Sequence, residues 1–252
     1  MVLTGVILLL LGLGAGYAGW SFHNGLRVGE AFLHRLGGCE MVMPDDRAAG
    51  RRVAVRGTLV GHRLVSDPID GTPCAWCRVT VEVRRRHRRS QRWDTVDDQR
   101  QEVPFELHDP RGGAVTVASV GDRVDGAETR GWTLRADAMP PEVQRYLALR
   151  NISPTGLFLS KWVRVTVSRL PAGGAYTVIG VPSHPGGLPG WRDSAAVRLH
   201  FAAPEAVTPL TLPALCEKLR SDHRAIATLR AMTLATSGVL LAASLGMLLS
   251  AL

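Results

Sequence analysis

Cys74 and Cys77, two cysteines separated by two residues, have the spacing in this sequence that best suits chemistry. A Cys-x-x-Cys pair can cycle between dithiol and disulfide, or supply half of a structural zinc site. Redox pairs of this kind open a helix, whose N-terminus lowers the thiol pKa, whereas this pair follows a turn and opens an alternating apolar run. We therefore predict one turn cysteine and one core-facing cysteine, with redox activity or a strained local disulfide as the alternative.

His108 and Asp109 are adjacent and could serve acid–base chemistry. Aspartate is also a common turn residue, and Gly112 and Gly113 follow it closely, so we assign Asp109 to capping a hairpin turn. The sequence has no Ser/His/Asp order, no paired carboxylates on one element and no phosphate-binding glycine loop. We predict no catalytic residue, no cofactor and no metal site.

A run of arginines is the strongest local signal, and we take it as the candidate contact for an anionic surface. It comprises Arg84, Arg85, Arg86, Arg88, Arg89 and Arg92. The run lies at the tip of a predicted hairpin, and three aspartates follow it. Arginines near a membrane gain about 1 kcal/mol each from anionic lipid. A solvated hairpin, partly neutralised by its own aspartates, is the interpretation favoured by the sequence alone. The partners to consider are the lipid bilayer, its anionic headgroups and an unidentified protein; nucleic acid is not expected.

The whole chain is basic, with 252 residues and a formal charge of +8. Such a balance suits an anionic partner. Lys161 and Lys218 are the only lysines among the 30 basic residues, however, so the excess is an arginine excess. Genome composition explains an excess of that kind as well as a polyanion does.

Both ends of the chain are apolar and carry no charged side chain. A membrane span needs roughly 20 apolar residues, so we assign transmembrane helices to residues 1–22 and 231–252. The first segment lacks the basic start and short apolar region of a cleaved signal peptide. The protein is therefore expected to be an integral membrane protein of the cell membrane.

Small residues recur at a spacing of four in both predicted spans. They are Gly12 and Gly16 in the first, and Gly238, Ala242 and Gly246 in the second. This spacing places them on one helix face, where two backbones can approach closely in lipid. We predict that the two spans pack against each other.

Juxtamembrane segments, residues 23–51 and 206–230, show apolar residues at helical spacing next to each span. We interpret the first as a helix that stops at Gly37 and Gly38 and is followed by a linker, and the second as a helix. Together they form stalks that carry the intervening domain. Cys39 and Cys216 lie on or beside these stalks. We expect free thiols there, with a disulfide between the two as the alternative.

The region between the stalks, residues 52–205, is dominated by alternating apolar residues and turn formers. The predicted strands cover residues 53–60, 76–83, 105–107, 114–117, 162–167, 175–180 and 196–201. A short helix is expected at residues 140–149, where prolines suit the first turn. The predicted fold class is mainly β, a small antiparallel barrel or sandwich with one short helix, flanked by the transmembrane helices and their stalks.

Three turn-and-strand motifs follow one another in this region. The first runs from Asp67 through Pro68, Gly71 and Pro73 to Cys74; the second spans residues 103–112 and contains Asp109 and Gly112; the third spans residues 170–180 and contains Gly173 and Gly180. In this order they resemble the "beside a membrane" (BAM) domain of the GIDE/MULAN-type membrane E3 ubiquitin ligases and their bacterial relatives. The resemblance implies that these eight residues are structural turn positions. The sequence departs from the family pattern at two places. Residue 77 is a cysteine where the family has an aromatic residue, and the acidic residue that the family has near position 167 is missing.

The resemblance also implies a link to ubiquitin transfer. Eukaryotic relatives carry a zinc-binding RING after the second span, whereas this sequence ends at Leu252 and offers only one close cysteine pair, so no RING is expected. We predict a membrane-anchored non-catalytic binding or scaffold module. The alternative is a component of a ubiquitin-type E3 ligase system that lacks its own RING.

Charges next to the spans predict the orientation. Arg27 and Arg35 follow the first span, and Arg224 and Arg230 precede the second. Because Lys and Arg near span ends stay in the cytoplasm, the β domain is expected there. The RING-bearing relatives imply the opposite orientation.

Overall fold

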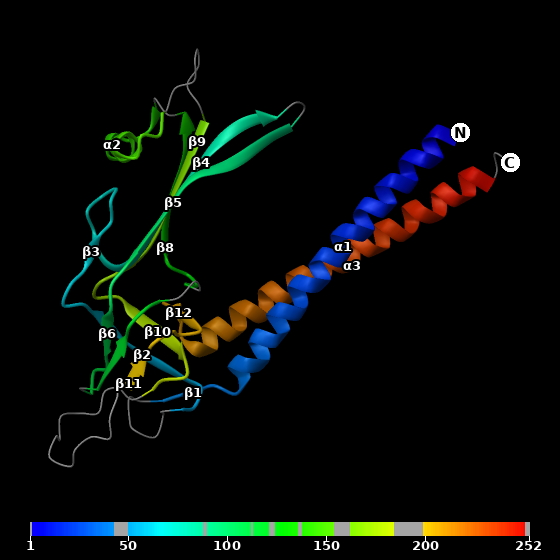
Figure 1. Ribbon diagram of the computed structural model, residues 1–252. Helices are drawn as coiled ribbons and strands as arrows, with labels where there is room; N and C mark the ends of the chain where they lie inside the picture. The colour runs from blue at the N-terminus through cyan, green and yellow to red at the C-terminus, as the bar shows by residue number, and fades with distance from the viewer. Residues whose placement is uncertain are drawn as a thin grey trace. The chain divides into compact units, whose positions relative to one another are not determined.

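A computed structural model describes residues 2–42, 50–87, 90–111, 113–120, 124–135, 138–153, 162–183 and 199–249. The chain divides into two compact units. The helical unit joins Met1–Cys39 to Pro213–Leu252, and the β unit is Glu40–Leu212. Figure 1 shows the two long helices of the first and the two sheets of the second.

The helical unit consists of α1 (Val2–Gly37) and α3 (Leu212–Leu249), which run side by side (Figure 1). Each helix continues from an expected membrane segment into its stalk: α1 extends to Gly37, and α3 begins at Leu212 rather than at residue 206. Among the described residues, one helix is long and apolar enough to cross a membrane, Leu212–Met247, whereas the apolar stretch of α1, Val6–Ser21, is shorter. The mainly β fold with a long apolar C-terminal helix is thus confirmed.

The glycines of α1 bring the two helices close together. A Cβ atom added at Gly12 would lie 3.0 Å from Leu241, and one at Gly16 would lie 3.3 Å from the Ser237 hydroxyl. The buried Ser237 hydroxyl donates to the Gly12 carbonyl at 2.7 Å, which satisfies a polar group in an apolar setting. The expected glycine face of α3 is not used here, because a Cβ at Gly238 would meet no atom within 4 Å.

The β unit contains two sheets and one short helix. The seven-stranded sheet contains β1 (Glu40–Met41), β2 (Val53–Val60), β6 (Phe105–His108), β7 (Ala114–Val117), β10 (Ala175–Gly180), β11 (Leu199–Phe201) and β12 (Ala206–Thr208). Its order is β11-β7-β6-β2-β10-β12, with β1 also paired to β2. The five-stranded sheet contains β3 (Val65–Ser66), β4 (Pro73–His87), β5 (Ser90–Glu102), β8 (Glu128–Arg135) and β9 (Trp162–Pro171).

The five-stranded sheet has the order β3-β4-β9-β8, and β5 pairs with the rest of β4. Helix α2 (Pro141–Leu149) covers part of this sheet. All strand pairs are antiparallel except β1 with β2 and β11 with β7. Residues 206–208, expected in a helix, form β12, which pairs with β10. Residues 196–198 of the last predicted strand lie outside the described residues.

Two apolar cores hold the β unit together. The first joins both sheets, with Trp76 and Leu170 of the five-stranded sheet packed among residues such as Leu107 and Val178. The second lies under α2, where Val143 and Leu147 pack on the valines of β4 and β9. Helix α2 thereby fixes the position of the residues at its C-terminal end relative to the long β4–β5 hairpin.

Candidate functional site

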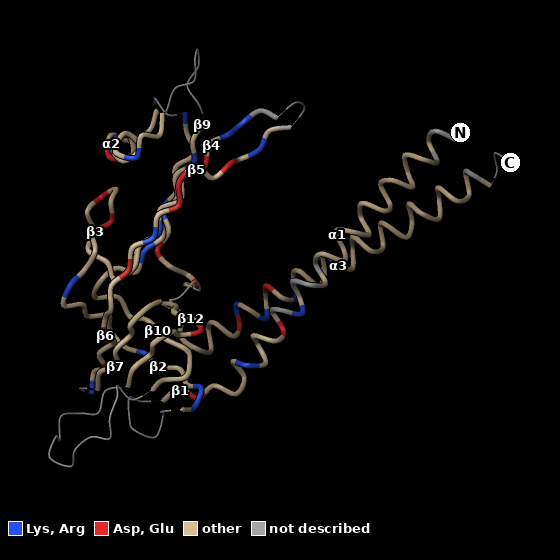
Figure 2. The backbone as a smooth tube through the Cα atoms, viewed as in Figure 1, with Lys and Arg blue, Asp and Glu red and all other residues tan. Residues whose placement is uncertain are grey.

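The arginine run lies at the far end of the hairpin formed by β4 and β5. The two strands pair from Trp76 and Glu102 to His87 and Ser90. Figure 2 shows basic residues on both strands near this end. Arg84 is exposed, and the side chains of Arg85 and Arg92 are 66% and 81% exposed. The Arg86 side chain, Arg88 and Arg89 lie outside the described residues.

The aspartates after the run neutralise its described part only partly. Of the three, Asp94 lies beside the described exposed arginines, 3.6 Å from Arg85 and 3.5 Å from Arg92. Asp98 binds Arg78 through two contacts of 2.9 and 2.7 Å. By sequence, residues 84–94 hold six arginines and one aspartate, a net charge of +5 with His87 neutral.

Asp97 is held at the end of α2. Arg150 donates to both of its carboxylate oxygens, at 3.0 and 3.2 Å, and the Tyr146 hydroxyl donates at 2.9 Å. Burial raises the pKa of Asp97, but the hydrogen bonds from Arg150, Tyr146 and Gln99 outweigh burial, so its pKa lies below the ordinary value. Asp97 therefore stays charged at neutral pH and is committed to Arg150.

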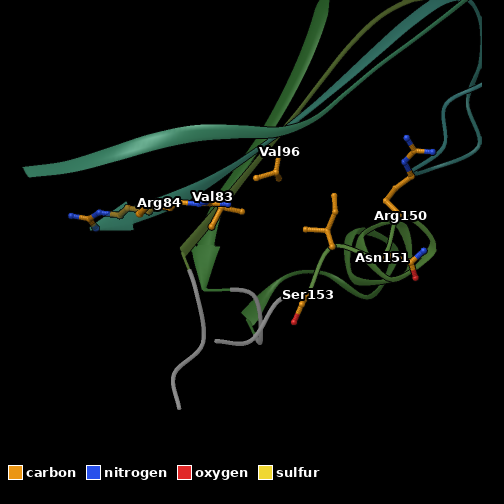
Figure 3. Close-up of a pocket in the computed structure, with 8 residues that line it drawn as sticks. Val83, Arg84, Val96, Arg150, Asn151 and Ser153 are labelled. Atoms are coloured by element: carbon orange, nitrogen blue, oxygen red, sulfur yellow. The ribbon is translucent and has the colours of Figure 1, made fainter. Parts of the chain in front are cut away.

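A hollow of about 660 Å³ lies between the hairpin and the end of α2. Its lining is apolar in part and basic in part: Val83, Val96, Ile152, Arg84, Arg85, Arg150, Asn151 and Ser153. Figure 3 shows the two valines on the hairpin side and the residues that follow α2 on the other. Its volume falls within the range of small-molecule sites. The combination suits a ligand that is anionic and partly apolar.

The far wall of the hollow is shaped by the cap of α2. The Ile152 amide donates to the Leu147 carbonyl at 2.9 Å, and the Asn151 amide donates to the Ala148 carbonyl at 3.0 Å. Asn151 has a φ of 55°, the left-handed conformation that this Schellman cap requires and that asparagine tolerates. Ile152 is thereby packed against the second core, and the chain turns toward the hairpin.

The opposite face of the hairpin is closed by stacking. The Arg164 guanidinium lies 4.3 Å from the centre of the Trp93 ring and contacts Glu82 at 3.2 Å. Such cation–π contacts stabilise by about 0.5–1 kcal/mol at exposed sites. Trp93 is the only Phe, Tyr or Trp residue among residues 84–94. Because Arg164 stacks on its ring, that face of the ring is already covered.

His108 and Asp109 have different partners, and the other described turn residues lie in turns or at the ends of strands. His108 Nε2 contacts Glu106 at 2.8 Å, while Asp109 accepts from the Arg111 amide at 3.3 Å within the hairpin turn. Gly71 and Gly173 have φ values of 75° and 77°, which favour glycine. A Cβ at Gly180 would lie 3.3 Å from Phe201. Pro68 lies in the turn before β4, Pro73 begins β4, and Gly112 lies outside the described residues.

An ion network beside the first turn motif was not anticipated. Arg169, 4% exposed, donates to Asp67 and Asp70 at 2.7–2.8 Å and to Glu128 at 2.8 Å. Burial lowers the pKa of Arg169, and these hydrogen bonds raise it above the ordinary value. The alternation of β9 could have indicated this arginine, because Val163, Val165 and Val167 place residue 169 on the buried face.

The two central cysteines lie on the same face of β4. Residues three apart in a regular strand point to opposite faces, but β4 is irregular against β9 between Cys74 and Trp76. Cys74 and Cys77 are both buried in the second core, while Ala75 and Trp76 turn to the first. The predicted turn cysteine is thus a buried strand residue.

None of the four cysteines forms a disulfide, so the alternative of a bond between Cys39 and Cys216 is not realised. Within the part of the chain that the structure describes, no group of three or more His, Cys, Asp or Glu side chains could hold a metal ion. Neither a scan against protein-family models nor a search of curated proteins finds a match for this chain.

Proposed function

We propose that this chain is a membrane-anchored, non-catalytic binding module whose β unit binds an anionic lipid surface. The contact is made by the arginine hairpin, which we define as residues 84–94 at the end of β4 and β5. The observation that carries the proposal is the pairing of Asp97 with Arg150 and of Asp98 with Arg78, which leaves Asp94 as the aspartate paired with the described arginines of the run. A lipid headgroup layer offers many phosphates to such a run, and the attraction is about 1 kcal/mol per arginine.

The neighbouring hollow favours lipid over nucleic acid. Val83, Val96 and Ile152 add apolar surface beside Arg84 and Arg85, which suits a phosphate attached to a glycerol or acyl group. Single-stranded nucleic acids are bound by basic grooves with free aromatic rings on which bases stack. Trp93 is covered by Arg164, so the described part of the run offers no such ring.

The anchor in this proposal is a pair of transmembrane helices, α1 and α3. The length and apolar character of α3 support it, as does the close approach of the helices at Gly12 and Gly16. Large apolar side chains are also exposed along the N-terminal part of α1: Val6, Ile7, Leu10, Leu11, Leu13, Tyr17 and Trp20. Such a surface suits lipid better than water.

The charges next to the spans favour a cytoplasmic β unit, and this orientation supports the proposal because the cytoplasmic leaflet is anionic. We expect a cysteine introduced at Ser90 to stay unlabelled by a membrane-impermeant maleimide in intact cells, in a chain whose four native cysteines are replaced by serine. Permeabilisation should then allow labelling. Labelling before permeabilisation would place the β unit outside.

The resemblance to the BAM domain supports a binding or scaffold module of a bacterial type, because three motifs follow in the same order between two apolar ends. The same observation raises the alternative of a component of a ubiquitin-type E3 ligase system that relies on a separate RING protein. An in vitro ubiquitylation assay separates the two. Transfer by this chain alone would overturn the non-catalytic proposal.

Flotation with vesicles tests the lipid proposal. Full-length protein in phosphatidylcholine nanodiscs is mixed with vesicles of phosphatidylcholine, with or without phosphatidylglycerol, and separated on a density gradient. We expect co-flotation with the anionic vesicles only, and a decline as salt rises, because exposed charges are screened. Equal binding to both vesicles, or preferential binding of single-stranded DNA in a competition arm, would refute it.

A further inference from the structure

Cys74 and Cys77 form a buried thiol pair, although a regular strand would separate them. The irregularity in β4 turns both sulfur atoms toward the second core. The Cys74 thiol donates to the Val65 carbonyl, with 3.6 Å between sulfur and oxygen. Both cysteine side chains are thus buried in one core on one face of β4, three residues apart in the chain.

The surroundings of the pair distinguish the two thiols. A hydrogen bond from Cys77 lowers the pKa of Cys74, and burial and the nearby Asp67 oppose it, while Arg169 assists. The same hydrogen bond and burial raise the pKa of Cys77. Arg169 is also the residue opposite Cys77 in the register of β9. Cys74 is thus the better nucleophile, and Cys77 is a protonated neighbour.

An oxidant can reach the two thiols past β3, a short strand at the edge of the five-stranded sheet. Cys74 contacts β3, an edge strand of two residues that pairs only with β4. Short edge elements open at a low free-energy cost compared with the core. Burial keeps large oxidants, such as disulfide reagents, away from the two thiols. A small neutral oxidant such as hydrogen peroxide can reach a sulfur atom that lies under such an edge strand.

We propose that Cys74 and Cys77 are a peroxide-responsive dithiol that closes to an intrachain disulfide. In the first step the Cys74 thiolate attacks one peroxide oxygen; an S–O bond forms, the O–O bond breaks, and the departing hydroxide takes a proton to become water. In the second step the Cys77 sulfur attacks the Cys74 sulfenic acid. The S–S bond forms, and the hydroxide leaves as water with the Cys77 proton. Two thiols and one peroxide give one disulfide and two waters.

A mass measurement on the full-length protein tests this site. Trypsin releases residues 64–78, which contain both cysteines and no other, while Cys39 and Cys216 fall in separate peptides. After graded peroxide treatment in detergent and alkylation of the remaining thiols, we expect an unalkylated 64–78 peptide about 2 Da below its dithiol mass, the mass of two hydrogens. It should form at lower peroxide concentration than oxidation of Cys39 and Cys216.

Two variants give the order of the steps. In Cys77→Ser, dimedone should trap a sulfenic acid on Cys74; in Cys74→Ser, Cys77 should stay unmodified under the same treatment. The wild-type mass result stands even where a variant folds poorly. A 64–78 peptide that keeps two alkylatable thiols when Cys39 and Cys216 are oxidised would overturn the proposal, and so would sulfinic acid on Cys74 without a disulfide.

Discussion

Replacing Arg169 with methionine is expected to destabilise the β unit by about 3–5 kcal/mol, the cost of breaking a buried ion pair by removing one partner. Methionine fills a similar volume, so the loss is electrostatic rather than a cavity effect. The substitution leaves the buried Asp67 carboxylate without this ion-pair partner and removes a hydrogen-bond donor from Asp70 and Glu128. Urea unfolding of the detergent-solubilised chain, followed by tryptophan fluorescence, measures the change.

Arg130→Met is the matched control, because Arg130 touches the same carboxylates, Asp70 at 2.9 Å and Glu128 at 3.8 Å, but is 53% exposed. Exposed pairs contribute about 0–1 kcal/mol, so this variant should remain close to wild type. Equal losses in the two variants would show that the burial of Arg169 does not matter.

The pH dependence of the Arg169→Met deficit provides a second readout. Burial raises the pKa of Asp70, but hydrogen bonds from Thr72 and Arg169 bring it below the ordinary value. A lowered folded-state pKa contributes stability above the unfolded value of about 4, which is lost as pH falls toward the folded value. The variant lacks part of the stability that the charged Asp70 contributes. The difference in free energy of unfolding between wild type and variant should therefore become smaller below about pH 4.

Exchange of Arg84 and Arg85 for glutamine is expected to weaken binding to phosphatidylglycerol vesicles by roughly 30-fold. Each arginine contributes about 1 kcal/mol at an anionic surface, and about 1.4 kcal/mol corresponds to a tenfold change in affinity. Both side chains are exposed and line the hollow, so glutamine should not disturb the core. The flotation assay with nanodisc-bound protein gives the affinity of both proteins.

The control removes the same charge elsewhere. Arg51 and Arg63 are exposed residues outside the arginine hairpin, and their double glutamine variant has the same net charge as the hairpin variant. We expect a change of less than about threefold, because screening limits the reach of a distant charge to about 10 Å. An equal loss in both variants would mean that net charge, and not the hairpin, determines binding.

The elements that depend on near neighbours in the chain could be predicted from the sequence. Alternation placed Val53–Val60, Ala114–Val117 and Ala175–Gly180 at their observed bounds, and prolines marked the start of α2. Glycines at Gly71 and Gly173 marked turns because a positive φ excludes most side chains. The apolar residues at both ends of the chain likewise predicted long helices.

Strands that depend on distant partners escaped prediction. β5 and β8 are largely polar and exposed, so they show little apolar alternation. They are strands because β4 and β9 offer them backbone hydrogen bonds along their length. Context of this kind outweighs the weak intrinsic preference of polar residues for strands.

The sites were decided almost entirely by tertiary structure. The sequence by itself determined the basic run, the cysteine spacing and the apolar ends. Only the fold paired Asp97 with Arg150 at the end of α2, joined Arg169 to Asp67, and turned Cys74 and Cys77 to one face. The physical reason is that electrostatic pairing and strand register depend on residues far apart in the sequence, such as Asp67 and Arg169, which are 102 positions apart. No local sequence pattern records such a distance.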